Sequence, residues 1–419
     1  MALLLVLVAC EDKLEITNRY SRPYYLEKIY PIYLDAREIL VEIQVKPSIP
    51  FDAAFKIASN EKYFFIGEKM KGIHVYEKTD ESHARPLCFI ECKYIKAFDV
   101  EGNILYCNNF TDLLVIDVEN PLQARIKHRE NRYFNDYSYS SYIPYLYNQF
   151  FNNFVYVIGY KQIVLTGTET DYDPAPDFSE YDELYENFIV NEIPDTIIVD
   201  RPFVGFANIE GNIFTLGGNS LIQCSYTDGY GYNTGFTMSP SGINIPYYGN
   251  VMPIGNLLYK DGMIFITCFN SGLICLDYNN LPTQRYDPNY VNVKDIVSIK
   301  QPANSLVFIT RFGYGYSDFL LHGSIIDEYF NPLTYINGYI SDATSLINVN
   351  NSILALSSHS ITLHSVVYQD MWNSSLRQDK QYPFGGSSML KEGDRLIVAN
   401  PQGLFFYDIS DLENIVPIP

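Results

Sequence analysis

The sequence predicts an all-β protein built from repeated sheets, and three observations carry that prediction. Of the 419 residues, 37 are Tyr and 26 are Phe, while only 19% are charged. Aromatic and β-branched side chains suit a pleated, half-buried surface. No long stretch has helical periodicity, and the two most helix-like segments, Arg37 to Val45 and Asp182 to Val190, are short. The third observation is a phrase that recurs along the chain.

The recurring phrase joins two apolar runs through turns of Asn, Asp, Glu and Gly. Its clearest copy is EGNILYCNNFTDLLVIDVENP at 101–121, and a near duplicate, EGDRLIVANPQGLFFYDISD, starts at Glu392. Other copies start at residues 60, 210, 260, 303 and 348, and a weak one, NNFVYVIGYKQIVLTG, starts at Asn152. Self-similarity of this kind is the signature of a repeat architecture.

The period of the repeat indicates which repeat architecture the chain forms. Its first apolar runs fall at spacings of 41, 51, 58, 51, 42, 47 and 43 residues, with anchors at Tyr63, Ile104, Val155, Ile213, Ile264, Leu306, Ile353 and Leu396. A period of about 40 to 50 residues is typical of the four-stranded blades of β-propellers. The two apolar runs would be the inner strands of a blade, buried on both faces. We therefore expect a propeller over residues 51–419, with eight blades favoured and seven as the alternative.

The chain before and between the repeats has its own expected roles. Residues 11–50 are expected to form a linker in which REILVEIQVKP, Arg37 to Pro47, alternates well enough to be an outer strand. Pairing of this strand with the last blade would close the ring, because an open propeller leaves an exposed edge. Residues at about 130–205 and 226–250 match the repeat poorly and are expected to be insertions.

An Asp ends the second apolar run in several copies, at Asp117, Asp277 and Asp408. A ring of ligands is the functional interpretation. Recurrence across copies favours a structural interpretation, in which each carboxylate caps the following turn, because the residues at repeated positions are determined first by the geometry of the blade.

The N-terminus, MALLLVLVACEDK, is typical of an exported chain. Leu3 to Ala9 form an apolar run, and the residues up to Cys10 resemble a bacterial lipobox, in which this Cys carries the lipid. Residues 1–10 are thus interpreted as a lipoprotein signal peptide. A buried first strand is the alternative, but it should be followed by turn chemistry rather than by Glu11-Asp12-Lys13. The lipid at Cys10 would be the only membrane contact.

The remaining cysteines and the net charge restrict the ligands. Most of the six, Cys88, Cys92, Cys107, Cys224, Cys268 and Cys275, stand singly inside apolar runs, and none shows the CxxC spacing of a zinc or redox site. Small buried core residues are the favoured interpretation and disulfides the alternative. No metal or cofactor is predicted. A net charge of −20 repels phosphate backbones, so nucleic acid is excluded as a partner.

The phrase LLVIDVENP resembles the LVIVD repeat. The order of features, from the lipobox at Cys10 through KGIHVYEK to the last copy at Leu404, is similar to the LVIVD-repeat β-propeller lipoproteins of Bacteroidetes. The resemblance covers most of the chain and implies a cell-envelope location with lipid anchoring to the outer membrane, on its periplasmic side or at the cell surface. It implies little about function, and residues 130–205 depart from its pattern.

Function is sought where the chain departs from the repeat. Arg132 to Phe151 hold six Tyr and three Phe, and Tyr226 to Asn250 are rich in Gly and Tyr. Tyr supplies flat amphipathic area for protein or sugar recognition. Packing of the insertions is the equal alternative. The candidate contact residues are Tyr137, Tyr139, Tyr142, Tyr145, Tyr230 and Tyr232. Thr168 to Asp195 carry ten carboxylates, interpreted as a solvated loop rather than a calcium site.

No catalytic residue is predicted, because GxSxG, HExxH and phosphate-cradling glycine patterns do not occur in the sequence. The favoured function is a non-catalytic binding scaffold for a protein or glycan at the envelope. The alternatives are a carbohydrate-active enzyme that uses paired carboxylates on blade loops, and a purely structural subunit of an envelope complex.

Overall fold

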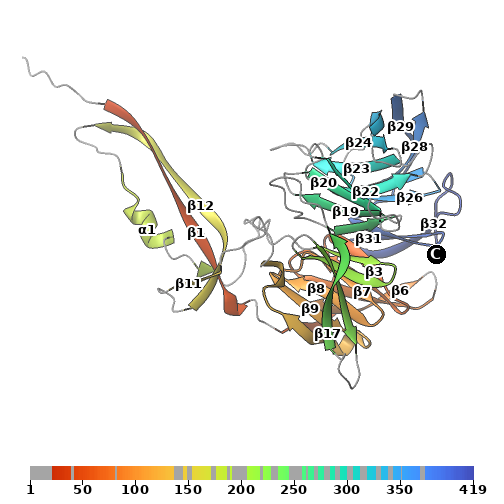
Figure 1. Cartoon of the computed structure of the whole chain (residues 1–419), viewed down its shortest axis with the longest axis horizontal. Helices are drawn as coiled ribbons and strands as arrows, with labels where there is room; N and C mark the ends of the chain where they lie inside the picture. The colour runs from red at the N-terminus through yellow and green to blue at the C-terminus, as the bar shows by residue number, and fades with distance from the viewer. Residues whose placement is uncertain are drawn as a thin grey trace, which may run out of the picture. The chain divides into compact units, whose positions relative to one another are not determined.

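The computed structural model describes most of the chain, in the ranges 21–38, 42–80, 83–135, 145–148, 153–170, 176–185, 189–190, 205–217, 220–227, 235–244, 257–260, 263–268, 272–277, 284–287, 293–299, 305–311, 319–326, 332–337, 343–350, 352–368 and 373–419. It divides into two compact units: unit 1, Met1–Glu38 with Pro144–Val199, and unit 2, Ile39–Ile143 with Asp200–Pro419. The class is all-β, with several small antiparallel sheets (Figure 1).

Unit 1 is built on a long pair of antiparallel strands, β1 (Ser21–Asp35) and β12 (Asn153–Thr170), drawn red and yellow in Figure 1. Short strands flank this pair near one end: β11 (Tyr145–Asn148) pairs with β12, and β13 (Ile189–Val190) runs parallel to β1. The 3-10 turn η1 (Ala36–Glu38) follows β1. The helix α1 (Ser179–Tyr185) is tied to β1 through Asp182, which accepts hydrogen bonds from Lys28 Nζ and Tyr30 OH, both at 2.5 Å.

Unit 2 consists of four-stranded antiparallel meanders that follow one another along the chain. Among the described strands there are seven, named meanders 1 to 7 here: β3–β6 (Ala54–Ser59, Tyr63–Glu68, Gly72–Lys78, Ala84–Glu91); β7–β10 (Phe98–Glu101, Ile104–Asn109, Asp112–Asp117, Arg125–Glu130); β14–β17 (Phe206–Ile209, Asn212–Gly217, Ser220–Thr227, Gly235–Asn244); β18–β21 (Leu257–Lys260, Met263–Cys268, Gly272–Asp277, Gln284–Asp287); β22–β25 (Val293–Ile299, Ser305–Arg311, Phe319–Ile326, Pro332–Asn337); β26–β29 (Ser345–Val349, Ser352–Leu356, Ile361–Tyr368, Asn373–Tyr382); and β30–β33 (Ser388–Glu392, Arg395–Asn400, Gly403–Asp408, Val416–Pro417). Meanders 5 and 6 share one eight-stranded sheet through a parallel β25–β29 contact. The short turn η2 (Pro121–Gln123) lies within meander 2, and the short turn η3 (Tyr133–Asn135) follows it.

Two expectations from the sequence are corrected by the strand pairing. Strand β2 (Gln44–Pro47), from the segment expected to pair with the last blade, instead pairs with β6 as a fifth strand of the first sheet. Val155, the anchor of the weak repeat at Asn152, lies in β12 and pairs with Asp35 of β1, so it belongs to unit 1 and to no meander. Sequence patterns could not predict either pairing, because the partner strand in each case lies far away along the chain.

The first strands of the meanders lie beside one another in chain order. Strand β3 contacts β7, β7 contacts β14, and the series continues through β18, β22, β26 and β30. Strand β30 in turn contacts β3, so the last meander lies against the first. Every meander therefore has a neighbour on each side.

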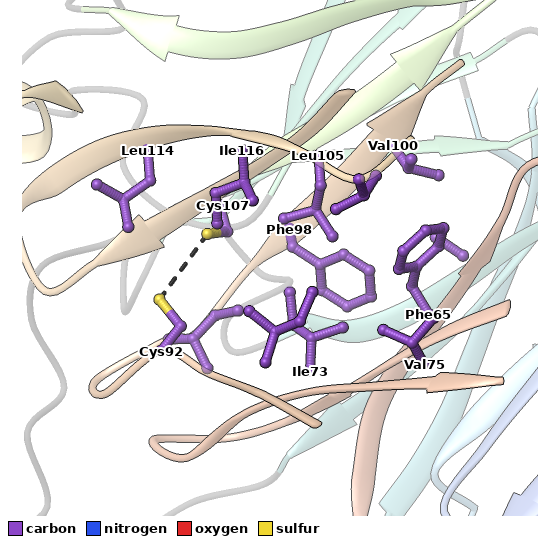
Figure 2. Packing of buried hydrophobic residues seen from close by; sticks show 14 of the residues in the cluster. Phe65, Ile73, Val75, Cys92, Phe98, Val100, Leu105, Cys107, Leu114 and Ile116 are labelled. Atoms are coloured by element: carbon purple, nitrogen blue, oxygen red, sulfur yellow. Dashed lines mark hydrogen bonds between the residues drawn. The ribbon is translucent and has the colours of Figure 1, made fainter. Parts of the chain in front are cut away.

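In meanders 1 and 2 this arrangement buries the second and third strands on both faces, as the sequence predicted, whereas β32 of meander 7 stays partly exposed. In β4, Phe65 packs toward meander 2 in a cluster with Phe98 and Leu105, as Figure 2 shows. Phe64 packs instead toward meander 7. Gly67 is required at its place, because a Cβ there would come within 2.6 Å of the Phe55 and Phe98 rings. Other clusters join meanders 2 and 3, 3 and 4, and 6 and 7 in the same way.

The contact between meanders 7 and 1 is made by side chains. Phe406 of β32 packs on Phe64 of β4 with ring centroids 5.7 Å apart, inside a cluster that also holds Ile66 and Ile397. At the polar margin, Lys78 Nζ donates to the Glu392 carboxylate at 3.1 Å, and Ala54 N donates to Ser387 Oγ at 2.7 Å. Meander 7 is formed entirely by residues 388–417, so packing rather than strand exchange holds it to meander 1.

Two smaller predictions are confirmed where the side chains are described. Asp117 Oδ1 accepts from Glu119 N at 3.1 Å and Asp408 Oδ1 from Ser410 N at 2.8 Å, so these carboxylates cap turns. The Asp277 side chain is outside the described set. Cys88, Cys92, Cys107 and Cys224 are free and buried, as expected of core residues. Among the described residues, no helix has the length and apolar character needed to span a membrane.

Replacement of Phe406 by Ala should destabilise unit 2. The side chain is 8% exposed and fills the contact between meanders 1 and 7, so we expect a loss of about 3–5 kcal/mol in the free energy of unfolding, measured by urea denaturation. Phe405→Ala is the matched control: its neighbouring ring is 38% exposed, and a change below about 1 kcal/mol is expected. Equal effects of the two substitutions would contradict this packing.

Candidate functional site

The residues predicted for partner binding lie almost entirely outside the described part of the chain. Cys10, Tyr137, Tyr139 and Tyr142 lie outside the described residues, and so do Tyr230 and Tyr232. Tyr145 begins β11, but its side chain is outside the described set. The described strands on either side still fix where the two Tyr-rich segments begin. The first follows β10 and η3, and the second joins β16 to β17. Because successive strands run in opposite directions, these departure points lie at opposite ends of neighbouring meanders.

The departure point of the first segment adjoins a group of connected turns, called the hairpin end here. It comprises the β4–β5 hairpin, the β6–β7 connection, the β8–β9 hairpin and the end of β10 with η3. Backbone bonds join the turns: Met70 N donates to Ile95 O at 2.8 Å, Tyr94 N to Met70 O at 3.1 Å, and Phe134 N to Thr111 O at 2.9 Å. Met70 and Tyr94 have positive φ, 69° and 64°, a strained conformation that surrounding contacts must hold.

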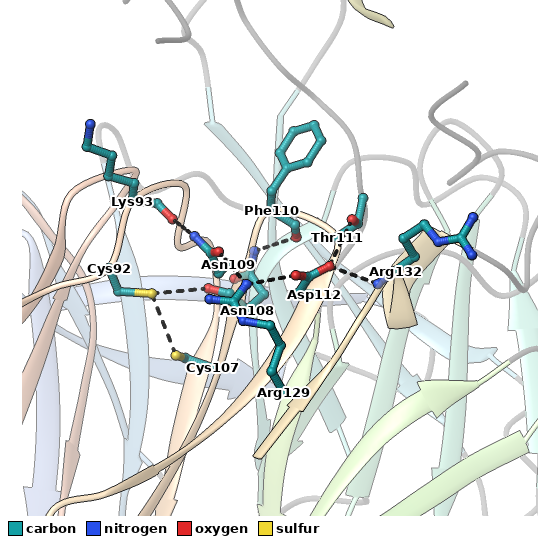
Figure 3. A network of polar contacts seen from close by, with 10 residues as sticks. All are labelled: Cys92, Lys93, Cys107, Asn108, Asn109, Phe110, Thr111, Asp112, Arg129 and Arg132. Atoms are coloured by element: carbon teal, nitrogen blue, oxygen red, sulfur yellow. Dashed lines mark hydrogen bonds and ion pairs between the residues drawn. The ribbon is translucent and has the colours of Figure 1, made fainter. Parts of the chain in front are cut away.

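Asp112 is the polar centre of the hairpin end (Figure 3). Its carboxylate is buried and accepts from Arg129 Nη1 at 2.8 Å and from the backbone N–H of Arg132 at 2.8 Å. Arg129 Nη1 also donates to Asn109 Oδ1 at 3.1 Å, and Asn109 Nδ2 donates to Lys93 O at 2.6 Å. A buried ion pair of this kind needs all its hydrogen bonds, because an unpaired charge there would be costly.

Asn108 holds two strained turns together. Its Oδ1 accepts from Lys96 N at 2.7 Å and Ala97 N at 3.0 Å, while Nδ2 donates to Tyr94 O at 3.1 Å and Phe110 O at 2.9 Å. Phe110 has a φ of 57°, which is rare for a residue with a bulky side chain. All four hydrogen-bonding positions of the amide are used, so Asn108 fixes the shape of the hairpin end.

Glu68 and His74 form the second polar group at this end, within meander 1. Glu68 Oε2 lies 2.9 Å from His74 Nε2, and Oε1 accepts from Lys71 Nζ at 2.7 Å. Burial alone would raise the pKa of Glu68, but the hydrogen bonds from Lys71 and His74 lower it below its usual value. Lys71 also pairs with the exposed Asp52 at 3.1 Å.

Glu68 and Asp52 share the ammonium group of Lys71. The hydrogen bonds that lower the pKa of Glu68 keep this carboxylate ionised and paired. The Glu68–Lys71–Asp52 group is therefore suited to holding the β4–β5 hairpin. No group of three or more metal-binding side chains was found among the described residues.

A third polar group links the first strands of meanders 1, 2 and 3 through Asp99. Its carboxylate accepts from Lys56 Nζ at 2.7 Å and from Asn208 N at 3.0 Å. The Asn208 side chain donates to Val100 O at 3.0 Å. Sequence reasoning missed Asp99, Asp112 and Glu68, because single acids in or beside apolar runs gave no recognisable spacing.

The structure places aromatic rings at the base of the insertion that follows β10. Phe134 of η3 meets Phe206, the first residue of β14, with ring centroids 5.5 Å apart and an interplanar angle of 81°. Tyr133 packs edge-on against Phe134 at 4.9 Å. The chain thus leaves unit 2 and returns to it through residues in contact, which pins both ends of the insertion.

Comparison with known proteins leaves the family open. No protein-family model matches the chain, and no curated protein matches it in sequence. Solved structures that match this chain include PorZ, described as an essential bacterial surface component of the type-IX secretion system of Porphyromonas gingivalis (7% identity, TM-score 0.41, 90% of this chain and 39% of PorZ covered). BamB from Moraxella catarrhalis is 10% identical, with a TM-score of 0.43 and coverage of 87% of this chain and 96% of BamB. Sqt1 from Saccharomyces cerevisiae is 11% identical, with a TM-score of 0.41 and coverage of 94% of this chain and 100% of Sqt1. This chain spans only 39% of the length of PorZ, and TM-scores below 0.5 carry no argument about function.

His364 should make unit 2 lose stability in acid. Nε2 of this buried side chain forms a hydrogen bond with Thr362 Oγ1 at 2.8 Å. Burial lowers the pKa of His364 from 6.5 to about 4. The unfolded chain binds a proton below pH 6.5 that the folded chain does not, so stability falls as the pH drops from 6.5 toward 4, by about 3 kcal/mol.

The test compares urea unfolding at pH 7 and pH 4.5. His364→Asn should flatten the difference by about 2–3 kcal/mol, whereas His359→Asn, at an exposed position, should leave the wild-type difference unchanged. Parallel pH profiles for wild type and His364→Asn would contradict the assignment.

Proposed function

We propose that unit 2 is a seven-bladed β-propeller and that the chain is a lipid-anchored binding scaffold of the LVIVD-repeat type. Seven blades replace the favoured eight, because β12, the weak eighth repeat, belongs to unit 1. The meanders support the propeller: each first strand lies beside the next, and β30 lies beside β3. The repeat phrase LLVIDVENP supports the family assignment.

The observation that carries the scaffold proposal is the pinned insertion. The Phe134–Phe206 contact and the bonds of Asp112 and Asn108 hold the hairpin end rigid where the insertion leaves and returns. Binding residues are often on loops that a rigid scaffold positions. We assign partner contact, with a protein or a glycan, to Tyr137, Tyr139, Tyr142 and Tyr145 of this insertion. Tyr230 and Tyr232, in a segment that leaves from the opposite end, are assigned a separate contact.

The cell envelope is the proposed location, with the lipid on Cys10 as the attachment to the outer membrane. A single acyl chain gives only reversible membrane binding, so a lipoprotein needs more than one acyl chain to be stably anchored. The sequence MALLLVLVAC carries this part of the proposal.

Cys10→Ser should abolish lipid attachment. Labelling of cells with a radioactive fatty acid should mark the wild-type chain and leave the variant unmarked, and the variant should keep its N-terminal segment by mass spectrometry. Cys88→Ser, at a buried core position, is the control and should be labelled normally. Equal labelling of wild type and Cys10→Ser would remove the lipid anchor from the proposal.

The combined substitution Tyr137→Ala, Tyr139→Ala and Tyr142→Ala should weaken partner binding at least about tenfold, because aromatic anchors dominate recognition surfaces. Binding is measured on a glycan array and by saturation binding to envelope fractions. Tyr230→Ala with Tyr232→Ala tests the second segment, and Phe405→Ala, at an aromatic side chain of β32 that is 38% exposed and outside both segments, is the control. Failure of the wild-type chain to bind any glycan or fraction saturably would overturn the scaffold function.

A further inference from the structure

The β1–β12 ribbon of unit 1 has one face that is exposed and almost uncharged. The face contains Tyr25 (64% exposed), Ile29 (55%), Tyr160 (65%) and Val164 (41%). The register places them together, since Tyr25 is opposite Thr166, Ile29 opposite Gln162, and Val164 opposite Glu27. Glu27 is the one charged residue on this face between Tyr25 and Pro31 and their β12 partners, and it is tied to Gln162 Nε2 at 2.7 Å and Tyr25 OH at 3.2 Å.

The outer edge of β12 beyond Tyr156 is likewise unpaired among the described strands. Strand β11 pairs only with residues 153–156, so along residues 157–170 the described strands cover β12 on its β1 side alone. Open edges are normally protected by Pro, by several Lys or by bulges. From Tyr160 to Thr170 the strand contains no Pro, and its charged residues are Lys161 and Glu169.

A two-stranded ribbon is marginally stable in water without further strands or a packed face. The helix α1 covers part of the other face, where Asp182 holds Lys28 and Tyr30. That contact leaves the Tyr25–Val164 face and the β12 edge without cover from the described residues. Among the described residues, the ribbon therefore presents both an uncovered backbone edge and exposed apolar area to a partner strand.

We propose that the occupant of this edge is the same strand of a second copy, paired antiparallel about Leu165. In that register Lys161 stands opposite Glu169 of the second copy, and by two-fold symmetry the pair occurs twice. Val164 stands opposite Thr166, and no like charges meet. The two charged residues of the segment have opposite sign and are equidistant from Leu165, which makes the strand complementary to itself.

Symmetry makes the second copy a better occupant than an unrelated strand. A two-fold axis normal to the sheet joins two ribbons into a four-stranded sheet, β1–β12–β12–β1, and keeps both exposed faces on the same side. The apolar area of Tyr25, Ile29, Tyr160 and Val164 then becomes a continuous surface across the dimer. Directly opposite charges on neighbouring strands contribute to such pairing, and like charges oppose it.

The test is the mass of the full chain in mild detergent, measured by sedimentation equilibrium at about 1 to 100 µM, because association depends on protomer concentration. Wild type should approach the dimer mass. Lys161→Glu and Glu169→Lys should each weaken dimerisation about tenfold, since each places two pairs of like charges in the interface. The double variant, Lys161→Glu with Glu169→Lys, should restore the wild-type dimer.

The control is Glu183→Lys, an exposed charge reversal on α1 away from the β12 edge, which should leave dimerisation unchanged. Circular dichroism of each variant establishes that the fold is retained. A monomer at all concentrations, with the edge left to a foreign strand or a membrane, would overturn the proposal. So would a dimer that tolerates both single reversals, or a double variant that stays as weak as the single ones.

Discussion

Each meander of unit 2 depends on having a neighbour on both of its faces. The residues of β4 and β5 alternate between Phe65 and Val75, directed to meander 2, and Phe64 and Ile66, directed to meander 7, and all are almost completely buried. A single four-stranded sheet with two apolar faces cannot cover itself, so it is stable only inside a series. A series with two ends would expose two such faces. The contact between Phe406 and Phe64 covers one face of meander 1 with meander 7.

The polar side chains complete this packing rather than compete with it. Asp99 joins three first strands, Asp112 and Asn108 hold turns with positive φ, and Glu68 secures the β4–β5 hairpin. A buried acid lowers stability unless its oxygens are hydrogen-bonded. Here each of these acids has at least two partners. The result is a firm hairpin end, where the strained turns keep one conformation and the insertion has a fixed base.

Unit 1 follows a different physical rule. Its β1–β12 pair is long and two-stranded, and α1 supports one face through Asp182. The ribbon is stabilised by its cross-strand pairs, and a two-stranded ribbon needs additional packing on its faces or edges to be stable in water. The two units thus differ in how their sheets are stabilised: the meanders of unit 2 cover one another's apolar faces, whereas one face of the β1–β12 ribbon keeps large apolar side chains exposed.

Sequence alone determined what depends on short spacings. The all-β class, the two-sided burial of the paired apolar runs and the turn-capping role of Asp117 and Asp408 each follow from side chains within about twenty residues of one another. Tertiary structure decided what depends on partners far apart in the chain. Val155 lies in an apolar run that resembles a repeat strand, yet it pairs with Asp35, and β2 pairs with β6 instead of the last meander. The polar centres Asp99 and Asp112 likewise exist only once distant strands and turns meet. An apolar run records that a strand will be buried, but the identity of its neighbour is set by packing that the run itself does not encode.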